Sequence, residues 1–242
     1  MGATGGRWGA GAGLAALVAG AGGVAFERAD PDVLAAGPTE YAAWVATYRT
    51  ELLLQSLMFV LSAGFLLVFF AGLRDRLARR ERSGAPYDDG LSTLVLGAGT
   101  AWVVVTLVAQ SGQAAMAYVS AGPGSAATTV AAMGDVVTVL LAFGNVPVVV
   151  LLAATAVVGL RWHALPGWLG WFSALAAVLH LAPVAGVVLE TGPLSPEGWV
   201  PYLVYPAFVV WLLGTTVVLA RAPGAAAEEL SPAAGRSRRA GP

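Results

Sequence analysis

Long apolar stretches without Asp, Glu, Lys or Arg dominate this sequence. A helix rises about 1.5 Å per residue and the hydrocarbon core of a bilayer is about 30 Å thick, so about 20 such residues can cross a membrane. A helix on the surface of a soluble domain would need a polar face along its length. The sequence therefore predicts an all-α polytopic membrane protein, a six-transmembrane-helix bundle with the lipid bilayer as its partner. The six stretches cover residues 8–26, 52–73, 94–118, 136–160, 166–189 and 199–220.

Arginine supplies all 13 formally cationic side chains, because the chain has no lysine. Eleven of these arginines precede the first stretch, follow the sixth, or lie between the second and third or the fourth and fifth. The other two are Arg28 and Arg49. Because cytoplasmic segments of membrane proteins are enriched in Arg and Lys, we expect both termini in the cytoplasm. The Ala-, Gly-, Val- and Arg-rich composition indicates a GC-rich bacterial genome, and hence a multi-pass protein of the bacterial inner (cell) membrane.

The two ends of the chain allow more specific expectations. Residues 1–221 are expected to form the transmembrane domain, and residues 222–242, rich in Ala, Pro, Gly and Arg, a disordered cytoplasmic tail. The first stretch also fits a cleavable signal peptide, because Arg7 precedes it and small residues precede Phe26. Cleavage would leave five spans with the same orientation. The length of the stretch and its glycines favour a retained helix that packs closely on its neighbours.

The largest segment predicted outside the membrane is Glu27–Thr50. Gly37, Pro38 and Thr39 form a helix start signal, and Tyr41, Trp44 and Tyr48 follow it at helical spacing. We expect an interfacial helix at the headgroups or an extension of the second span, since aromatic residues are common at that level. The alternative is a lid over an external opening.

Several classes of chemistry are excluded by residues that the chain lacks. Without cysteine it has no disulfide, thiol nucleophile or thiolate zinc site, and without lysine it has no Schiff base. Two histidines cannot build a multi-histidine metal site, so we expect no metal and no cofactor. A net charge of −1 argues against a nucleic-acid partner. An enzyme acting on lipid ranks last, because no catalytic constellation is present.

Polar side chains inside the apolar stretches concentrate in the half predicted to face outward. His180 and Asn145 would each lie about 13 Å deep at 1.5 Å per residue. Asn145 shares one helix face with Asp135, and Gln110 shares another with Gln113. Prolines follow the same asymmetry and each removes one backbone hydrogen bond, which predicts kinks at similar depths. They are Pro147, Pro183 and Pro206.

This distribution predicts an outward-facing, partly polar pocket that binds or transports a small molecule, because lipid cannot satisfy inward polar groups or freed carbonyls. Its expected lining is His180, Asn145, Gln110 and Gln113, with Asp135 and Tyr205 nearer the mouth. The histidine could make it proton-sensitive. The alternative is a structural or interaction protein, whose polar stripes only lock helices together or form a homo-oligomer.

Two motifs carry a resemblance to a known family. They are "FAGLRDRLARRE", which ends the second span, and "GLRWHALPGWLGWFSALAAVL", which enters the fifth. With the small-residue first span after "RWGA", they resemble a family of uncharacterised actinobacterial six-helix integral membrane proteins, a domain-of-unknown-function family. The resemblance covers most of residues 7–221. It implies six helices and no assigned biochemical role, so it transfers no functional residue.

Overall fold

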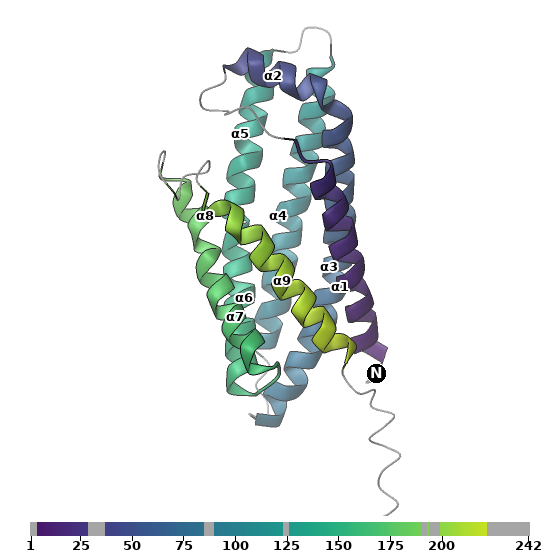
Figure 1. The fold of residues 1–242 in the computed structure, drawn as a ribbon, viewed down its shortest axis with the longest axis vertical. Coiled ribbons are helices and arrows are strands. Elements are labelled where there is room, and N and C mark those ends of the chain that lie inside the picture. The colour runs from purple at the N-terminus through teal and green to yellow at the C-terminus, as the bar shows by residue number, and fades with distance from the viewer. Residues whose placement is uncertain are drawn as a thin grey trace, which may run out of the picture.

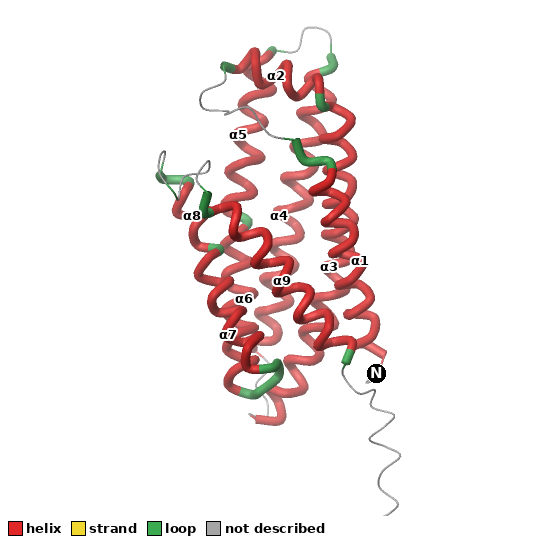
Figure 2. The backbone as a smooth tube through the Cα atoms, viewed as in Figure 1, coloured by secondary structure: helices red, strands yellow, loops and turns green. Residues whose placement is uncertain are grey.

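The structure, a computed structural model, describes residues 4–28, 37–84, 90–122, 126–189, 193 and 199–221. These residues form nine α-helices and no strand (Figure 2). Six helical stretches among them are long and apolar enough to cross a membrane. The all-α, six-helix membrane bundle is therefore confirmed, whereas the predicted tail lies outside the described residues. The helices are α1 Thr4–Ala25, α2 Pro38–Thr47, α3 Arg49–Gly84, α4 Gly90–Ser120, α5 Ala127–Phe143, α6 Asn145–Arg161, α7 Gly167–Leu179, α8 Leu181–Gly186 and α9 Pro201–Ala220.

Two of the six spans are broken helices. The fourth changes from α5 to α6 at Gly144, and the fifth changes from α7 to α8 at His180. Pro147 and Pro183 each lie in the first turn of the helix that follows the break. Proline is tolerated there, because a first-turn backbone N–H has no acceptor within its own helix. The kinks expected from these prolines thus take the form of helix breaks just before them.

Two of the helices extend beyond the apolar stretches predicted from sequence. The second span is predicted at 52–73, but α3 runs from Arg49 to Gly84 and includes an arginine-rich extension. The fourth is predicted to begin at 136, but α5 begins at Ala127. Helical backbone hydrogen bonds do not end where hydropathy changes, and Arg, Glu, Leu and Ala all favour helix. Hydropathy therefore locates the membrane-crossing part of each helix and underestimates its length.

The bundle has two distinct ends. We call the end that contains Arg74, Arg161 and Arg221 the arginine end, and the opposite end the α2 end. At the α2 end, α2 lies across the bundle and contacts α4 and α5 (Figure 1). Its Tyr41 is buried, and a Cβ atom on Gly134 of α5 would collide with the ring of Tyr41. The helix start predicted at Gly37 is confirmed, and α2 is packed onto the bundle through its aromatic face.

Close packing near the arginine end joins α1, α3 and α9. In Figure 1, α9 crosses obliquely in front of the other helices and meets α1 near the arginine end. A Cβ atom on Gly9 would lie 3.1 Å from the backbone of Gly72 in α3, and a Cβ atom on Gly13 would collide with Thr216 of α9. Glycine is therefore required for this approach, as the small residues of the first span predict.

Two hydroxyl groups in the buried middle of the bundle donate to carbonyls of their own helices. Thr155 donates to the carbonyl of Leu151 at 2.7 Å, and Thr215 donates to that of Trp211 at 2.6 Å. The indole Nε1 of Trp211 donates to Ser173 Oγ at 3.0 Å, which links α9 to α7. Such pairing removes the penalty for burying these polar groups. This part of the bundle is a filled core.

Candidate functional site

A cavity of about 780 Å³ lies inside the bundle. It extends from Glu27, just beyond α1, to Leu66 of α3 and Leu212 of α9. Its lining side chains come from α1, α3, α4, α5, α6, α8 and α9, and from His180 at the α7–α8 break. Most of them are apolar. The polar or charged ones are Glu27, Gln55, Ser62, Thr106, Gln110, Gln113, Thr138, Asn145, His180 and Tyr205.

The structure brings five of the six predicted site residues to this one cavity: His180, Asn145, Gln110, Gln113 and Tyr205. The exception is Asp135, which is exposed on α5 and does not line the cavity. Because α5 begins at Ala127, Asp135 lies within the helix and not at the entrance to a span. Thr138, the next residue of the same polar stripe, lines the cavity instead. Of this polar stripe, Thr138 and Asn145 line the cavity and Asp135, one turn earlier, does not.

His180 and Asn145 form the central polar contact. The atoms His180 Nδ1 and Asn145 Oδ1 are 2.7 Å apart. The Nδ2 atom of Asn145 donates to the carbonyls of Leu141 at 2.9 Å and Ala142 at 3.2 Å, in the last turn of α5. Since only the amide nitrogen can donate to carbonyls, Asn145 presents its oxygen to the imidazole. His180 must therefore donate through Nδ1.

Two buried polar atoms of the lining residues have no hydrogen-bond partner within the described part of the chain. They are His180 Nε2 and Gln110 Oε1. A buried polar atom without a partner costs about 1–3 kcal/mol, and most such atoms in native proteins are paired. The His180 ring also meets Phe208 of α9 edge to face, with 6.2 Å between ring centroids and an angle of 81°. These groups combine unmet hydrogen bonds with an aromatic surface.

Other polar residues of the lining hold neighbouring helices together. Gln113 Nε2 of α4 donates to Gln55 Oε1 of α3 at 2.8 Å and to the carbonyl of Leu52 at 3.3 Å. Ser62 Oγ of α3 donates to the carbonyl of Ala16 in α1 at 2.9 Å. These contacts are the kind of interhelical hydrogen bond that the structural alternative predicts. Among the buried side-chain atoms of the described lining, His180 Nε2 and Gln110 Oε1 remain without a partner.

The first span contributes to the lining, which its sequence did not indicate. Gly20 and its neighbours on α1 line the cavity, but this span carries no polar side chain that could signal a site. A Cβ atom on Gly20 would lie 3.5 Å from Ser62 Oγ and 3.6 Å from the Tyr205 hydroxyl. Glu27 was assigned to an external segment and also reaches the cavity. Glycine at position 20 thus leaves space between α1, α3 and α9.

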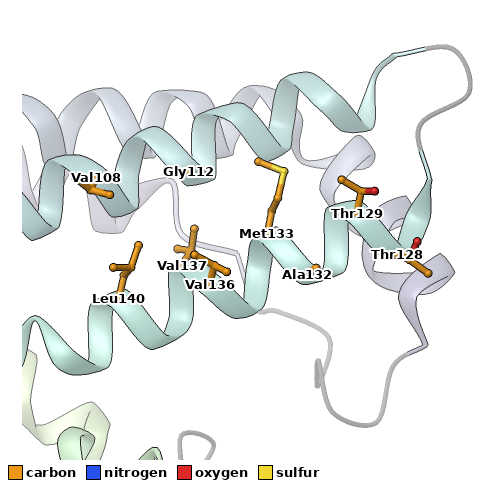
Figure 3. Close-up of a pocket in the computed structure, with 9 residues that line it drawn as sticks. All are labelled: Val108, Gly112, Thr128, Thr129, Ala132, Met133, Val136, Val137 and Leu140. Atoms are coloured by element: carbon orange, nitrogen blue, oxygen red, sulfur yellow. The ribbon is translucent and has the colours of Figure 1, made fainter.

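A second hollow, of about 520 Å³, lies between α4 and α5. Figure 3 shows Met133, Val137 and Leu140 pointing from α5 toward α4. Two threonines, at positions 128 and 129, provide the hydroxyl groups of its lining. It contains none of the predicted site residues and no converging amide or ionisable groups. Binding sites for specific ligands combine apolar lining with such groups, so the larger cavity is the candidate site.

Comparisons of the chain with protein-family models, with curated proteins and with solved structures found no match. The resemblance to an actinobacterial membrane-protein family therefore remains a prediction. Within the described residues, no group of three His, Asp or Glu side chains lies close enough to hold a metal ion. The geometry of the cavity in this multi-pass membrane protein is therefore the observation that bears on its function.

Proposed function

We propose that this protein binds a small, largely apolar molecule in the cavity lined by His180, Asn145 and Gln110. The observation that carries the proposal is a 780 Å³ space within a membrane bundle, whose lining contains two buried polar atoms without a partner among the described residues. Ligand sites commonly have volumes of about 300–1,000 Å³, with apolar lining and few orienting polar groups. Ionisable residues within membrane spans also mark functional sites more often than structural ones.

The arginines give the proposed orientation. In the described segments, eight arginines belong to the arginine end, whereas Arg28 and Arg49 belong to the α2 end. Because arginine accumulates on the cytoplasmic side, we place the arginine end in the cytoplasm of a bacterial cell. Glu27 and Tyr205 line the cavity toward the α2 end, so the ligand enters from the outward half. The eight are Arg7, Arg74, Arg76, Arg79, Arg80, Arg82, Arg161 and Arg221.

Cysteine accessibility tests whether the cavity is open. The chain contains no cysteine, so one introduced cysteine gives an unambiguous signal. We expect a membrane-impermeant thiol reagent added to intact cells to label Ala142→Cys, because Ala142 lines the cavity. Ala156→Cys is the matched control, since Ala156 is buried and does not line it. Gly122→Cys and Ser83→Cys, exposed at opposite ends, report orientation. No labelling at 142 when position 122 reacts would contradict the proposal.

Ligand binding is tested by filling the space. Gly20→Leu places a side chain in the cavity, whereas Gly11→Leu, also on α1, meets nothing within 4 Å. Both substitutions give α1 the same gain in helix propensity, so a difference between them reports the cavity. With 2-naphthol as probe, we expect saturable binding to the unmodified protein and to Gly11→Leu, and at least tenfold weaker binding to Gly20→Leu. Binding that is equal in both variants would place the probe elsewhere.

A structural function is the second candidate, favoured by the Gln113–Gln55 and Ser62–Ala16 hydrogen bonds between helices. Under that alternative, the polar residues only hold helices in register or support a homo-oligomer. Ala142→Cys would then remain unlabelled and no probe would bind saturably. The same two experiments therefore decide between the candidates.

A further inference from the structure

We infer that the ligand carries a hydrogen-bond donor, such as a hydroxyl or an ammonium group, on a flat apolar body, and has no negative charge. The inference rests on the proposed function, since it specifies which molecules the same cavity accepts. It follows from the tautomer of His180, the charges of the lining and the aromatic rings around the imidazole.

The tautomer of His180 is fixed by a chain of hydrogen bonds. The two carbonyls at the end of α5 hold the amide nitrogen of Asn145, so Asn145 Oδ1 is the atom that meets His180 Nδ1 at 2.7 Å. In a neutral imidazole that donates through Nδ1, Nε2 carries no proton and is a hydrogen-bond acceptor. That acceptor is buried and has no partner among the described residues. A hydrogen-bond donor on the ligand would satisfy this acceptor.

Gln110 does not impose the opposite requirement. Its Oε1 is buried without a partner, and no side-chain hydrogen bond to another described residue fixes the orientation of its amide. A free amide can rotate to present either its oxygen or its nitrogen. Gln110 therefore adapts to the ligand, and His180 determines that the ligand must donate.

The charges of the lining exclude an anion. Glu27 is the only formally charged residue in the described lining, and none of the arginines in the described segments lines the cavity. A buried anion would find no permanently cationic side chain in the described lining and would have to pair with a protonated His180, whose charged form is itself costly to bury. A neutral donor avoids this penalty, and a cationic donor gains attraction from Glu27.

Aromatic rings determine the shape of the ligand body. Trp102 and Phe208 are packed with 4.7 Å between ring centroids and both line the cavity, and Phe208 also contacts the His180 ring. Aromatic surfaces stack on flat apolar groups, and their faces also attract cations. A planar aromatic molecule with one donor therefore suits this surface.

The test compares four naphthalene probes of similar size on the purified full-length protein. They are 2-naphthol, its methyl ether, 2-naphthoate and 2-naphthylmethylamine. We expect 2-naphthol to bind about tenfold more tightly than 2-methoxynaphthalene, because one hydrogen bond to a buried acceptor is gained. The amine should also bind more tightly than the ether, and naphthoate should bind most weakly. An ether that binds as tightly as naphthol, or a naphthoate that binds best, would overturn the inference.

Two variants connect the preference to the imidazole and to the cavity. His180→Phe keeps a ring and removes Nε2, so the ratio between naphthol and its ether should fall to about one. If this variant does not fold, the comparison of naphthol with its ether on the unmodified protein still tests whether the ligand must donate a hydrogen bond. A further outcome is that the ether binds saturably to Gly11→Leu and not to Gly20→Leu while naphthol shows no advantage over it. That result would support ligand binding in the cavity and would contradict the inference that the ligand is a hydrogen-bond donor. If no probe binds saturably, the proposed function itself fails.

Discussion

His180 and Asn145, which lie at the breaks of two different membrane spans, are joined by a 2.7 Å hydrogen bond. Asn145 begins α6 immediately after Gly144, and His180 separates α7 from α8. The Asn145 amide also donates to carbonyls at the end of α5. One pair of side chains thus satisfies backbone groups that a helix break exposes and connects the two interrupted spans.

The first prediction is that this pair couples the stability of the two spans. His180→Phe leaves Asn145 Oδ1 without its donor, and Asn145→Leu leaves His180 Nδ1 without its acceptor. Each single variant should lower the free energy of unfolding, and the double variant should lower it by less than the sum. We expect a coupling energy of about 1 kcal/mol, in the range of interhelical hydrogen bonds in membranes. Denaturant unfolding in mixed micelles measures it.

Thr155→Val is a matched control for this comparison of single and double variants. Thr155 is buried but donates within its own helix, to the carbonyl of Leu151. Combined with His180→Phe, its effect should be additive within about 0.5 kcal/mol. A coupling energy near zero for the His180–Asn145 pair would show that the contact contributes nothing to the folded state.

The second prediction concerns two glycines of α4 that differ only in their surroundings. A Cβ atom on Gly99 would collide with the Phe70 ring, whereas a Cβ atom on Gly97 meets nothing within 4 Å. Phe70 is fully buried and cannot move aside easily. Gly99→Ala should therefore lower the melting temperature, and Gly97→Ala should raise it or leave it unchanged, because alanine favours helix by about 1 kcal/mol over glycine. Equal shifts for both variants would refute the close α3–α4 contact.

The third prediction concerns Glu81, which lies in the arginine-rich extension of α3 yet is fully buried. Its carboxylate accepts hydrogen bonds from the backbone N–H groups of Leu91 at 3.1 Å and Ser92 at 3.0 Å. A carboxylate at a helix N-terminus satisfies free N–H groups and complements the helix dipole. Glu81→Ala should lower the free energy of unfolding by about 2 kcal/mol, because two charged hydrogen bonds are lost.

Asp75→Ala is the control for Glu81→Ala, since Asp75 is an exposed acidic residue on the same helix. We expect it to change the unfolding free energy by less than about 0.5 kcal/mol. Glu81→Gln should fall between the two, because the amide keeps one acceptor oxygen and no charge. Unfolding followed by circular dichroism ranks the three variants. An unfolding free energy that Glu81→Ala leaves unchanged would show that the contact with α4 does not stabilise the fold.

The fourth prediction concerns the turn between α6 and α7. His163 has φ = 51°, in the left-handed region that favours glycine. Non-glycine residues pay roughly 1–2 kcal/mol there, and β-branched residues pay more. His163→Gly should keep or raise the melting temperature, and His163→Val should lower it. His163 is exposed, so loss of burial does not confuse the comparison. A stabilising valine would show that this turn adopts another backbone conformation.

Hydropathy predicted the part of the fold that depends on the bilayer. The absence of charge over about 20 residues determines where a helix can cross, so the six spans were found correctly. Hydropathy could not predict that Glu81 accepts hydrogen bonds from the first turn of α4, because a charged residue among five arginines is expected to be exposed to solvent. Nor could it place the break at Gly144, since a proline indicates a weakened helix without fixing the residue at which the helix ends.

The candidate site was predictable where polarity marked it. Gln110, Gln113 and Asn145 stand out because an amide in an apolar span must face other protein groups. Gly20 could not be recognised, since its contribution is the absence of a side chain beside Ser62 and Tyr205. Asp135 was included because it continues the Asn145 stripe, but a stripe does not indicate where a cavity ends. Residue spacing shows which side chains share one face of a helix. Which of those side chains line a cavity depends on how the neighbouring helices pack against that face.

The lining residues are spread from position 16 to position 212, and α9 alone contributes Val204, Tyr205, Phe208, Val209 and Leu212. A chain of which only the first five spans have been inserted therefore lacks the wall of the cavity that α9 provides. Binding of a ligand in this cavity is therefore expected only after the sixth span has been inserted and has packed against the other helices.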